Sequence, residues 1–258
     1  MAAAAPPGAV SRIGAAASMG KYNESGEARS SRVEDLFSRI APRYDLINDL
    51  QSLGLHRLWK RRLVRLAGIP DGGAALDLCC GTGDIVRALA RAYPRAGLVV
   101  GLDFAMPMLR IAGARGGGRG PRTLYLRADA LRIPSRGGSF DCVTIAYGLR
   151  NVASIENCLD EVRRVLRPGG RFLMLDFGKP QNPVVARLYF AYLRSAVPLF
   201  GRIFFGDPDT HGYIHDSLLR FPSQVEIASM LGRAGFARVR VENALFGAMG
   251  IVTGEREE

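Results

Sequence analysis

The sequence predicts an α/β protein in which a doubly wound, mostly parallel sheet of seven strands carries helices on both faces. Segments typical of buried strands and of amphipathic helices alternate from residue 74 to residue 254. A glycine-rich turn follows the first of these strands and opens a helix, and the second strand ends in an acid. Such alternation favours parallel strands joined by helical crossovers on both sides of a sheet.

The individual elements follow the apolar pattern and the residues that break it. Strands are predicted over residues 74–79, 97–102, 124–127, 140–146, 171–176, 237–241 and 246–254, and helices over 84–93, 105–113, 154–166 and 223–234. Pro and Gly within 167–170 predict a tight turn into the fifth strand. We expect one domain over 31–258, with an N-terminal helical cap over 33–67 and a helical insertion over 180–222.

Residues 1–30 differ in composition from the rest and are left out of the predicted fold. The first twenty are rich in Ala, and no acidic residue precedes Glu24. This composition resembles an organelle transit peptide, because it lacks the continuous apolar core of a secretory signal. A disordered tail is the alternative.

The chain of 258 residues carries a formal net charge of +11 and has a pI near 10.1. Such a charge favours an anionic partner, such as nucleic acid or a membrane surface, or it reflects arginines spread over solvated surface. The cysteines Cys79, Cys80, Cys142 and Cys158 lack the spacing of metal ligands, so we expect reduced core residues and no metal site.

The segment 184–205 is apolar and aromatic but is not predicted to span a membrane. Arg187, Arg194 and Arg202 interrupt it, and Pro198 is expected to kink or end its helix. Arg187 and Arg194 are seven residues apart and so share one helical face. A basic stripe beside aromatic residues suits peripheral contact with a membrane or a lid over an apolar substrate. A plain core helix is the alternative.

The run D-L-C-C-G-T-G-D from Asp77 to Asp84 resembles motif I of the S-adenosylmethionine-dependent methyltransferases. Position 86 is Val, where a dinucleotide-binding turn has a third glycine, and this disfavours a pyrophosphate. The resemblance implies the Rossmann-like class I methyltransferase fold with S-adenosyl-L-methionine as cofactor. Because ligands bind past the carboxyl ends of parallel strands, the expected cofactor-binding residues are Asp77, Gly81, Thr82, Gly83, Asp103, Phe104, Asp129 and Ala130.

Three of these residues are acids at successive strand ends. Asp77 and Asp103 would supply negative charge near a sulfonium and its ribose, and Asp129 would accept a hydrogen bond from an adenine amine. Each acid alone is equally typical of a helix cap or a turn. Their repetition at three strand ends favours a nucleoside site.

Two further blocks resemble a more specific family. Residues 147–152 read Y-G-L-R-N-V, and residues 44–60 contain Y-D-L-I-N-D and S-L-G-L-H-R-L-W-K. Both are similar to the UbiE/MenG C-methyltransferases of ubiquinone and menaquinone biosynthesis, and the D-L-C-C-G-T-G-D run resembles their plastid and cyanobacterial branch. This implies methylation of demethylphylloquinol or demethylmenaquinol, the last methylation of phylloquinone biosynthesis, in a chloroplast. A benzoquinol acceptor of ubiquinone biosynthesis and a mitochondrial location are the alternatives.

The same resemblance implies the catalytic residues. Arg150 and Asn151 would hold the quinol oxygens, with Tyr147 beside them, and Arg150 would stabilise developing phenolate charge. His56 is a candidate base, or else a histidine that packs between helices. One serine contact of the family falls on Ala146, where its hydroxyl is lost.

Two other classes of function are weighed against this one. A nucleic-acid methyltransferase would explain the charge, but an amino-methylating enzyme needs an N/D-P-P-Y/F turn where this chain has A-Y-G-L-R-N. A scaffold without activity would not be expected to keep three cofactor acids. We therefore expect an enzyme that acts on a small lipid quinol and not on nucleic acid. The sequence does not predict an oligomeric state.

Overall fold

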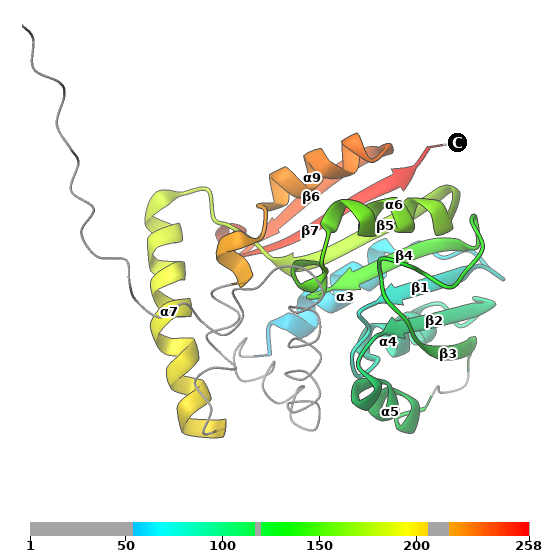
Figure 1. Ribbon diagram of the computed structural model, residues 1–258, viewed down its shortest axis with the longest axis horizontal. Coiled ribbons are helices and arrows are strands. Elements are labelled where there is room, and N and C mark those ends of the chain that lie inside the picture. Colours follow the sequence, from blue (N-terminus) through cyan, green and yellow to red (C-terminus); the bar gives the residue numbers. More distant parts are fainter. Residues whose placement is uncertain (1–53, 117–119, 206–216, 258) are drawn as a thin grey trace, which may run out of the picture.

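A seven-stranded sheet forms the centre of the computed structural model, which describes residues 54–116, 120–205 and 217–257 (Figure 1). For 196–205 only the backbone is described. The strand order is β3-β2-β1-β4-β5-β7-β6. The strands are β1 (Ala74–Leu78), β2 (Leu98–Asp103), β3 (Arg122–Arg127), β4 (Phe140–Ala146), β5 (Leu166–Phe177), β6 (Phe236–Ala244) and β7 (Met249–Arg256). All neighbours pair in parallel except β7, which is antiparallel to β5 and β6, so the predicted mostly parallel sheet is confirmed.

Helices cover the two faces of this sheet. The α-helices are α3 (His56–Leu66), α4 (Asp84–Ala92), α5 (Met106–Ala114), α6 (Ile155–Val165), α7 (Pro183–Phe205) and α9 (Gln224–Arg233). Leu63 of α3 and Leu89 of α4 belong to one buried cluster, and Leu159 of α6 and Leu231 of α9 belong to the other. The two clusters are the cores on either side of the sheet.

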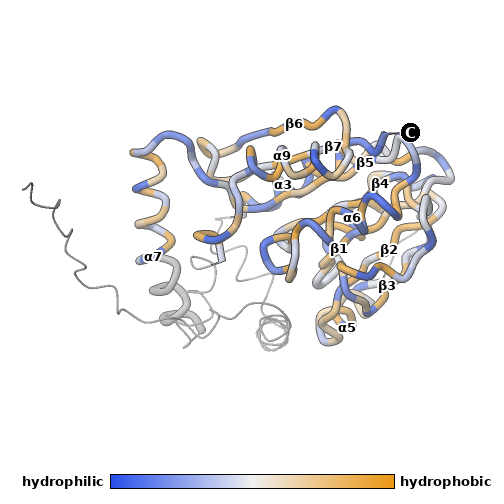
Figure 2. The backbone as a smooth tube through the Cα atoms, turned by 45° about the horizontal axis from the view of Figure 1, so that its top comes forward, coloured by the Kyte–Doolittle hydropathy of each residue, from blue (hydrophilic) through white to orange (hydrophobic). Residues whose placement is uncertain are grey.

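The exposure of the residues in each strand follows from the position of that strand in the sheet. The central strand β1 is buried at all five residues, as expected for a parallel strand covered on both faces. The strand β3 lies at one edge and exposes both its terminal arginines, and β6 lies at the other edge with alternating exposure. Hydrophobic residues follow the central strands in Figure 2, whereas α7 carries both hydrophobic and hydrophilic residues.

The structure corrects some predicted boundaries. β5 begins at Leu166, because Phe140 pairs with Leu166 and Cys142 pairs with Arg171, so the turn residues 167–170 bulge out of a continuous strand. β7 begins at Met249, since Leu245–Gly247 form the 3₁₀ turn η3. Of the predicted cap over 33–67, the described part is α3, and residues 1–30 lie outside the described residues.

The helix does not end at Pro198, although an end was one of the two outcomes expected there. α7 continues from Pro183 to Phe205 as one helix. A proline removes a single N–H from the helical ladder, and the hydrogen bonds of the neighbouring turns continue the helix beyond it. Within the described chain, none of the helices combines the length and apolar character that a membrane span requires.

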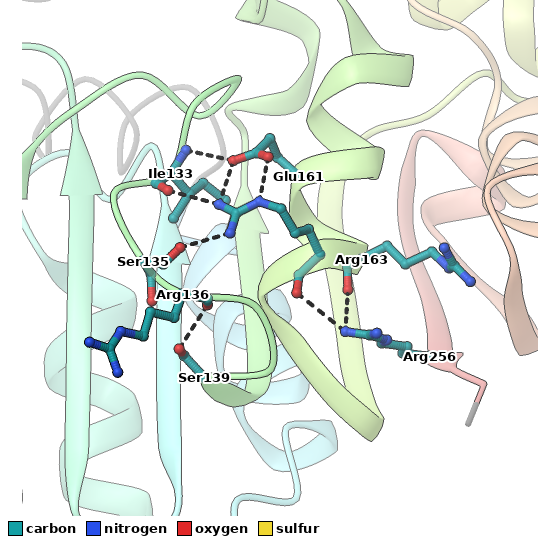
Figure 3. A network of polar contacts seen from close by, with 8 residues as sticks. Ile133, Ser135, Arg136, Ser139, Glu161, Arg163 and Arg256 are labelled. Atoms are coloured by element: carbon teal, nitrogen blue, oxygen red, sulfur yellow. Dashed lines mark hydrogen bonds and ion pairs between the residues drawn. The ribbon is translucent and has the colours of Figure 1, made fainter.

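A polar network ties the loop before β4 and the end of β7 to α6 (Figure 3). Glu161 accepts a hydrogen bond from the backbone N–H of Ile133 at 2.8 Å and pairs with Arg164, whose guanidinium also donates to the Ser135 carbonyl at 2.7 Å. Arg256 Nη1 donates to the carbonyls of Arg163 at 2.9 Å and Arg164 at 3.2 Å, and to that of Leu166. These carbonyls belong to the end of α6, where helical partners run out.

We expect the variant R256M to lower the free energy of unfolding by about 1–3 kcal/mol, because it removes the side-chain donor to the carbonyls of Arg163 and Leu166 at the end of α6. Urea denaturation measures the change. The control is R95M, which breaks an exposed ion pair with Asp71 and should cost less than about 1 kcal/mol. Equal losses in the two variants would contradict the capping role of Arg256.

Candidate active site

The glycine turn after β1 begins the candidate site. Gly81 and Gly83 have φ values of 53° and 79°, in the left-handed region that glycine adopts without strain. Gly83 directly precedes α4, and a Cβ built on it would lie 2.7 Å from Tyr125 Oη. The turn therefore has no room for a side chain at Gly83, and it brings the N-terminus of α4 to the carboxyl edge of the sheet.

Asp103, at the end of β2, is fixed against this turn. Its carboxylate accepts the backbone N–H of Gly81 at 2.8 Å and that of Ala105 at 2.9 Å. The side chain is buried. The spacing of about twenty residues between turn and acid thus brings the two together, as the sequence predicts.

Asp77 is a buried carboxylate within β1. It accepts a hydrogen bond from Thr144 Oγ1 at 2.6 Å across the β1–β4 pair. Burial raises the pKa of Asp77 to about 7, although the Thr144 hydroxyl and the Lys60 ammonium act to lower it. A buried acid of this kind lacks full compensation for its charge.

Basic side chains surround Asp84 at the start of α4. None of these basic residues was predicted to belong to the site. Lys60 Nζ lies 3.3 Å from Asp84 Oδ2, and Arg87 pairs with Oδ1 while donating to the Thr82 carbonyl at 2.7 Å. Burial acts to raise the pKa of Asp84, but Lys60, Arg87 and Arg115 outweigh it and the pKa is lowered. Arg87 thereby holds the buried Thr82 in the turn.

The exits of β2 and β3 lie side by side. The backbone N–H of Ala128 donates to the Asp103 carbonyl at 3.1 Å, and Arg127 Nε donates to the Phe104 carbonyl at 2.9 Å. Asp129 is exposed and accepts the backbone N–H of Leu131 at 2.9 Å, while Ala130 is buried. The predicted cofactor residues after three strands therefore meet at one edge.

The exits of β1 and β4 are in close contact. Cys79 and Tyr147 have φ values of 51° and 60°, which non-glycine residues rarely adopt. A Cβ built on Gly148 would lie 2.5 Å from Cys79 Cβ. Cys79 therefore lies against the residue that follows Tyr147, and strained backbone of this kind clusters at functional sites.

An ion pair and two rings form the β4–β5 side of the site. Arg150 Nη1 lies 2.6 Å from Asp176 Oδ1 and donates to the Tyr147 carbonyl at 3.0 Å. The Arg150 guanidinium lies 5.2 Å from the centre of the Phe177 ring, and that ring is 5.4 Å from the Tyr147 ring. Burial raises the pKa of Asp176 despite Arg150. Asp176 ends a parallel strand as Asp103 does, but no catalytic or cofactor-binding role was predicted for it.

The two other predicted catalytic residues lie at the same edge of the sheet. His56 is the buried first residue of α3, one turn before the Lys60 that pairs with Asp84. Asn151 ends the 3₁₀ turn η2 (Leu149–Asn151) and is partly exposed. Lys60 thus joins α3 to the start of α4, and Asn151 follows Arg150 at the β4 exit.

All four cysteines are free thiols, as predicted, and three of them are buried. Cys79 is partly exposed at the glycine turn, which differs from the predicted core position. Burial raises the pKa of Cys79 and Cys80 well above the ordinary value, so they are thiols and not thiolates at neutral pH.

The strand order and the glycine turn after β1 define a class I methyltransferase. The model of the ubiE/COQ5 methyltransferase family matches residues 25–256, and the chain belongs to this family. The ubiquinone/menaquinone biosynthesis C-methyltransferase UbiE of Hahella chejuensis is 39% identical over 228 residues, which cover 88% of this chain and 92% of that relative.

Two solved structures share the fold at low sequence identity. A possible histamine N-methyltransferase of Thermotoga maritima has a TM-score of 0.61 and 19% identity, covering 86% of this chain and 99% of its own. Phosphoethanolamine N-methyltransferase 2 of Haemonchus contortus, in complex with S-adenosyl-L-methionine, has a TM-score of 0.57 and 15% identity. The match covers 78% of this chain and 52% of that protein's chain. This chain is an S-adenosyl-L-methionine-dependent methyltransferase.

The described residues fit this cofactor. Asp77 is a buried acid that a positively charged ligand would compensate, and Lys60 alone does not. A carboxylate accepts about four hydrogen bonds, so Asp103 can serve a ribose diol in addition to two backbone N–H groups. We therefore expect Asp77, Asp103 and the turn Gly81–Gly83 to hold the cofactor.

We expect the variant D77N to change how stability depends on pH in the cofactor-free protein. Folding raises the pKa of Asp77 from its ordinary value of 3.8 to about 7, so the folded state binds the extra proton and this group's stabilisation is lost as pH rises between those values. The whole effect is on the order of 4 kcal/mol.

Urea denaturation at pH 5 and pH 8 measures this difference. D77N should gain stability relative to wild type as pH rises, while its affinity for the positively charged S-adenosyl-L-methionine falls. Parallel pH curves for the two proteins would contradict the assignment.

A second expectation concerns the buried ion pair. D176N should lower the free energy of unfolding by about 3–5 kcal/mol, because it leaves the Arg150 guanidinium buried without its counter-charge. The double variant R150Q/D176N should recover part of that loss, as urea denaturation can measure. If the loss of unfolding free energy in the double variant equalled the sum of the losses in R150Q and D176N, the two side chains would not interact.

Proposed function

We propose that this chain methylates a ring carbon of a prenylated quinol. The observation that carries the proposal is the match to the ubiE/COQ5 family over residues 25–256, with a relative at 39% identity that is named as a C-methyltransferase of ubiquinone/menaquinone biosynthesis. S-adenosyl-L-methionine supplies an activated methyl group when bound. The protein then has to align the acceptor carbon with that methyl group, and positioning of this kind lowers a barrier by about 7–11 kcal/mol.

The acceptor we propose is a naphthoquinol, demethylphylloquinol or demethylmenaquinol. The D-L-C-C-G-T-G-D run and the Ala-rich first residues support phylloquinone biosynthesis in a chloroplast. A benzoquinol of ubiquinone biosynthesis is the second candidate, because the name of the Hahella relative covers both quinones. A mitochondrial location would accompany it.

The rings of Tyr147 and Phe177 offer an apolar surface for a flat aromatic acceptor. Arg150 would oppose the negative charge that develops on a quinol oxygen as its proton leaves. Asp176 holds this guanidinium in one orientation through a 2.6 Å contact, so no reorientation is needed during the reaction. Asn151 would hold the second oxygen, and His56 is the candidate proton acceptor.

Radiolabelled S-adenosyl-L-methionine tests the proposal with short-chain naphthoquinols, benzoquinols and RNA, each incubated with the full chain. We expect labelled naphthoquinol when dithionite keeps the acceptor reduced, and no label on the oxidised quinone, whose ring carbon is poor in electrons. Faster labelling of benzoquinols would favour the second candidate, and label on RNA alone would contradict both.

The variant R150A should lower kcat on the reduced naphthoquinol by about 10²–10³, and H56A by about 10²–10⁴ if His56 takes the proton. The control R95A alters an exposed residue and should keep the wild-type rate. Binding of S-adenosylhomocysteine by calorimetry shows whether each variant still folds. Wild-type rates for R150A and H56A would remove both residues from the mechanism.

A further inference from the structure

Helix α7 presents a stripe of apolar side chains to solvent. Val184, Leu188 and Tyr192 recur every four residues and are 66%, 67% and 41% exposed. On the opposite side, Leu193 is buried and Tyr189 Oη donates to the Ala248 carbonyl at 3.3 Å. Because an α-helix turns about 100° per residue, the three exposed side chains form one stripe that faces away from the sheet.

Two arginines flank this stripe. Arg187 and Arg194 are exposed and lie two turns apart on the same edge of the exposed arc. Helices that lie in the interface between lipid and water carry such basic edges beside an apolar face. The apolar stem of an arginine can follow that face while its guanidinium reaches a lipid phosphate.

The turn η3 between β6 and β7 adds a second exposed apolar group. Phe246 is 84% exposed, and Leu245 beside it is 47% exposed. Their φ values of 55° and 48° lie in the left-handed region, which is costly for residues with a side chain. The backbone therefore holds an aromatic ring out in water at the expense of local strain.

The buried side chain of Gln224 fixes this turn through hydrogen bonds. Its Nε2 donates to the Gly247 carbonyl and to Asn243 Oδ1, both at 2.9 Å, and its Oε1 accepts the backbone N–H of Lys179 at 2.9 Å. The Tyr189–Ala248 hydrogen bond then joins η3 to α7, which stands at the edge of the molecule near the β6–β7 turn (Figure 1). These hydrogen bonds hold η3, and with it the exposed Phe246, in a fixed position.

We propose that these residues form a docking surface for a membrane of anionic lipids. This α7–η3 surface consists of Val184, Arg187, Leu188, Tyr192, Arg194, Leu245 and Phe246. Its arginines and the net charge of +11 attract anionic headgroups, and its apolar side chains can enter the acyl boundary. A second copy bound by two-fold symmetry would bring like-charged arginines together, which disfavours a dimer through this surface.

Co-sedimentation with vesicles tests this proposal without any substrate. Phosphatidylcholine vesicles with and without phosphatidylglycerol are compared. We expect L188E/F246E to bind both kinds of vesicle at least about tenfold more weakly than wild type, because two inserted apolar side chains are replaced by charges. R187Q/R194Q should bind about tenfold more weakly only where phosphatidylglycerol is present.

The matched control is L126E, which places the same charge on an apolar residue, 39% exposed, of the edge strand β3. It should bind vesicles as wild type does, and thermal unfolding checks that every variant is folded. Wild-type binding by L188E/F246E, or no vesicle binding by the wild type, would overturn the proposal. So would a change from dimer to monomer in L188E/F246E with unchanged vesicle binding, because the occupant would then be a second copy.

The inference is connected to the proposed function, since a prenylated acceptor resides in lipid. The docking proposal and the proposed reaction can be contradicted independently of each other. Turnover of a soluble short-chain naphthoquinol tests the reaction without vesicles, and vesicle binding tests the surface without turnover. L188E/F246E should keep wild-type turnover of the soluble acceptor and lose turnover of a long-chain acceptor embedded in vesicles.

Discussion

The candidate site depends on an acid that the fold buries without full compensation. Asp77 lies in the central strand β1, where helices cover both faces of the sheet and water cannot solvate its charge. Thr144 and Lys60 offset only part of this cost, and the pKa remains near neutrality. Such a residue makes the empty protein less stable than an apolar residue would. Its chemistry suits a positively charged ligand, so cofactor binding and folding are linked through this one carboxylate.

The side of the site that we propose for the acceptor also buries an acid, but this acid is paired with a cation. There Arg150 lies 2.6 Å from Asp176, and each compensates the charge of the other. In the function that we propose, one side of the site attracts a cation, and the other holds a cation that opposes developing negative charge. The two sides meet where Gly148 packs against Cys79, with no space for a Cβ. A shift of the β1 exit would consequently displace the β4 exit that carries Arg150.

The parts of the site that the sequence predicts are those whose partners follow a strand directly. Gly81, Gly83 and Asp103 could be selected because parallel strands bring their carboxyl ends to one edge. The Lys60–Asp84 pair depends on the packing of α3 beside α4, which no strand pattern indicates. Asp176 ends a parallel strand as Asp103 does, but its pairing with Arg150 depends on the turn η2 that carries the guanidinium. Of the two outcomes expected at Pro198, a helix end does not occur, since the loss of one N–H does not outweigh the rest of a long helix.

Some of the basic residues lie on the edge strands of the sheet, where their charge has a further effect. An edge strand offers unpaired N–H and carbonyl groups to any passing chain, and charged side chains and bulges discourage such pairing. β3 begins and ends with the exposed arginines Arg122 and Arg127. β6 changes register between Ala237 and Arg240, with Arg238 in a left-handed conformation. Some of the surplus arginines thus keep neighbouring molecules from joining their sheets, and this protection against aggregation requires no anionic partner at all.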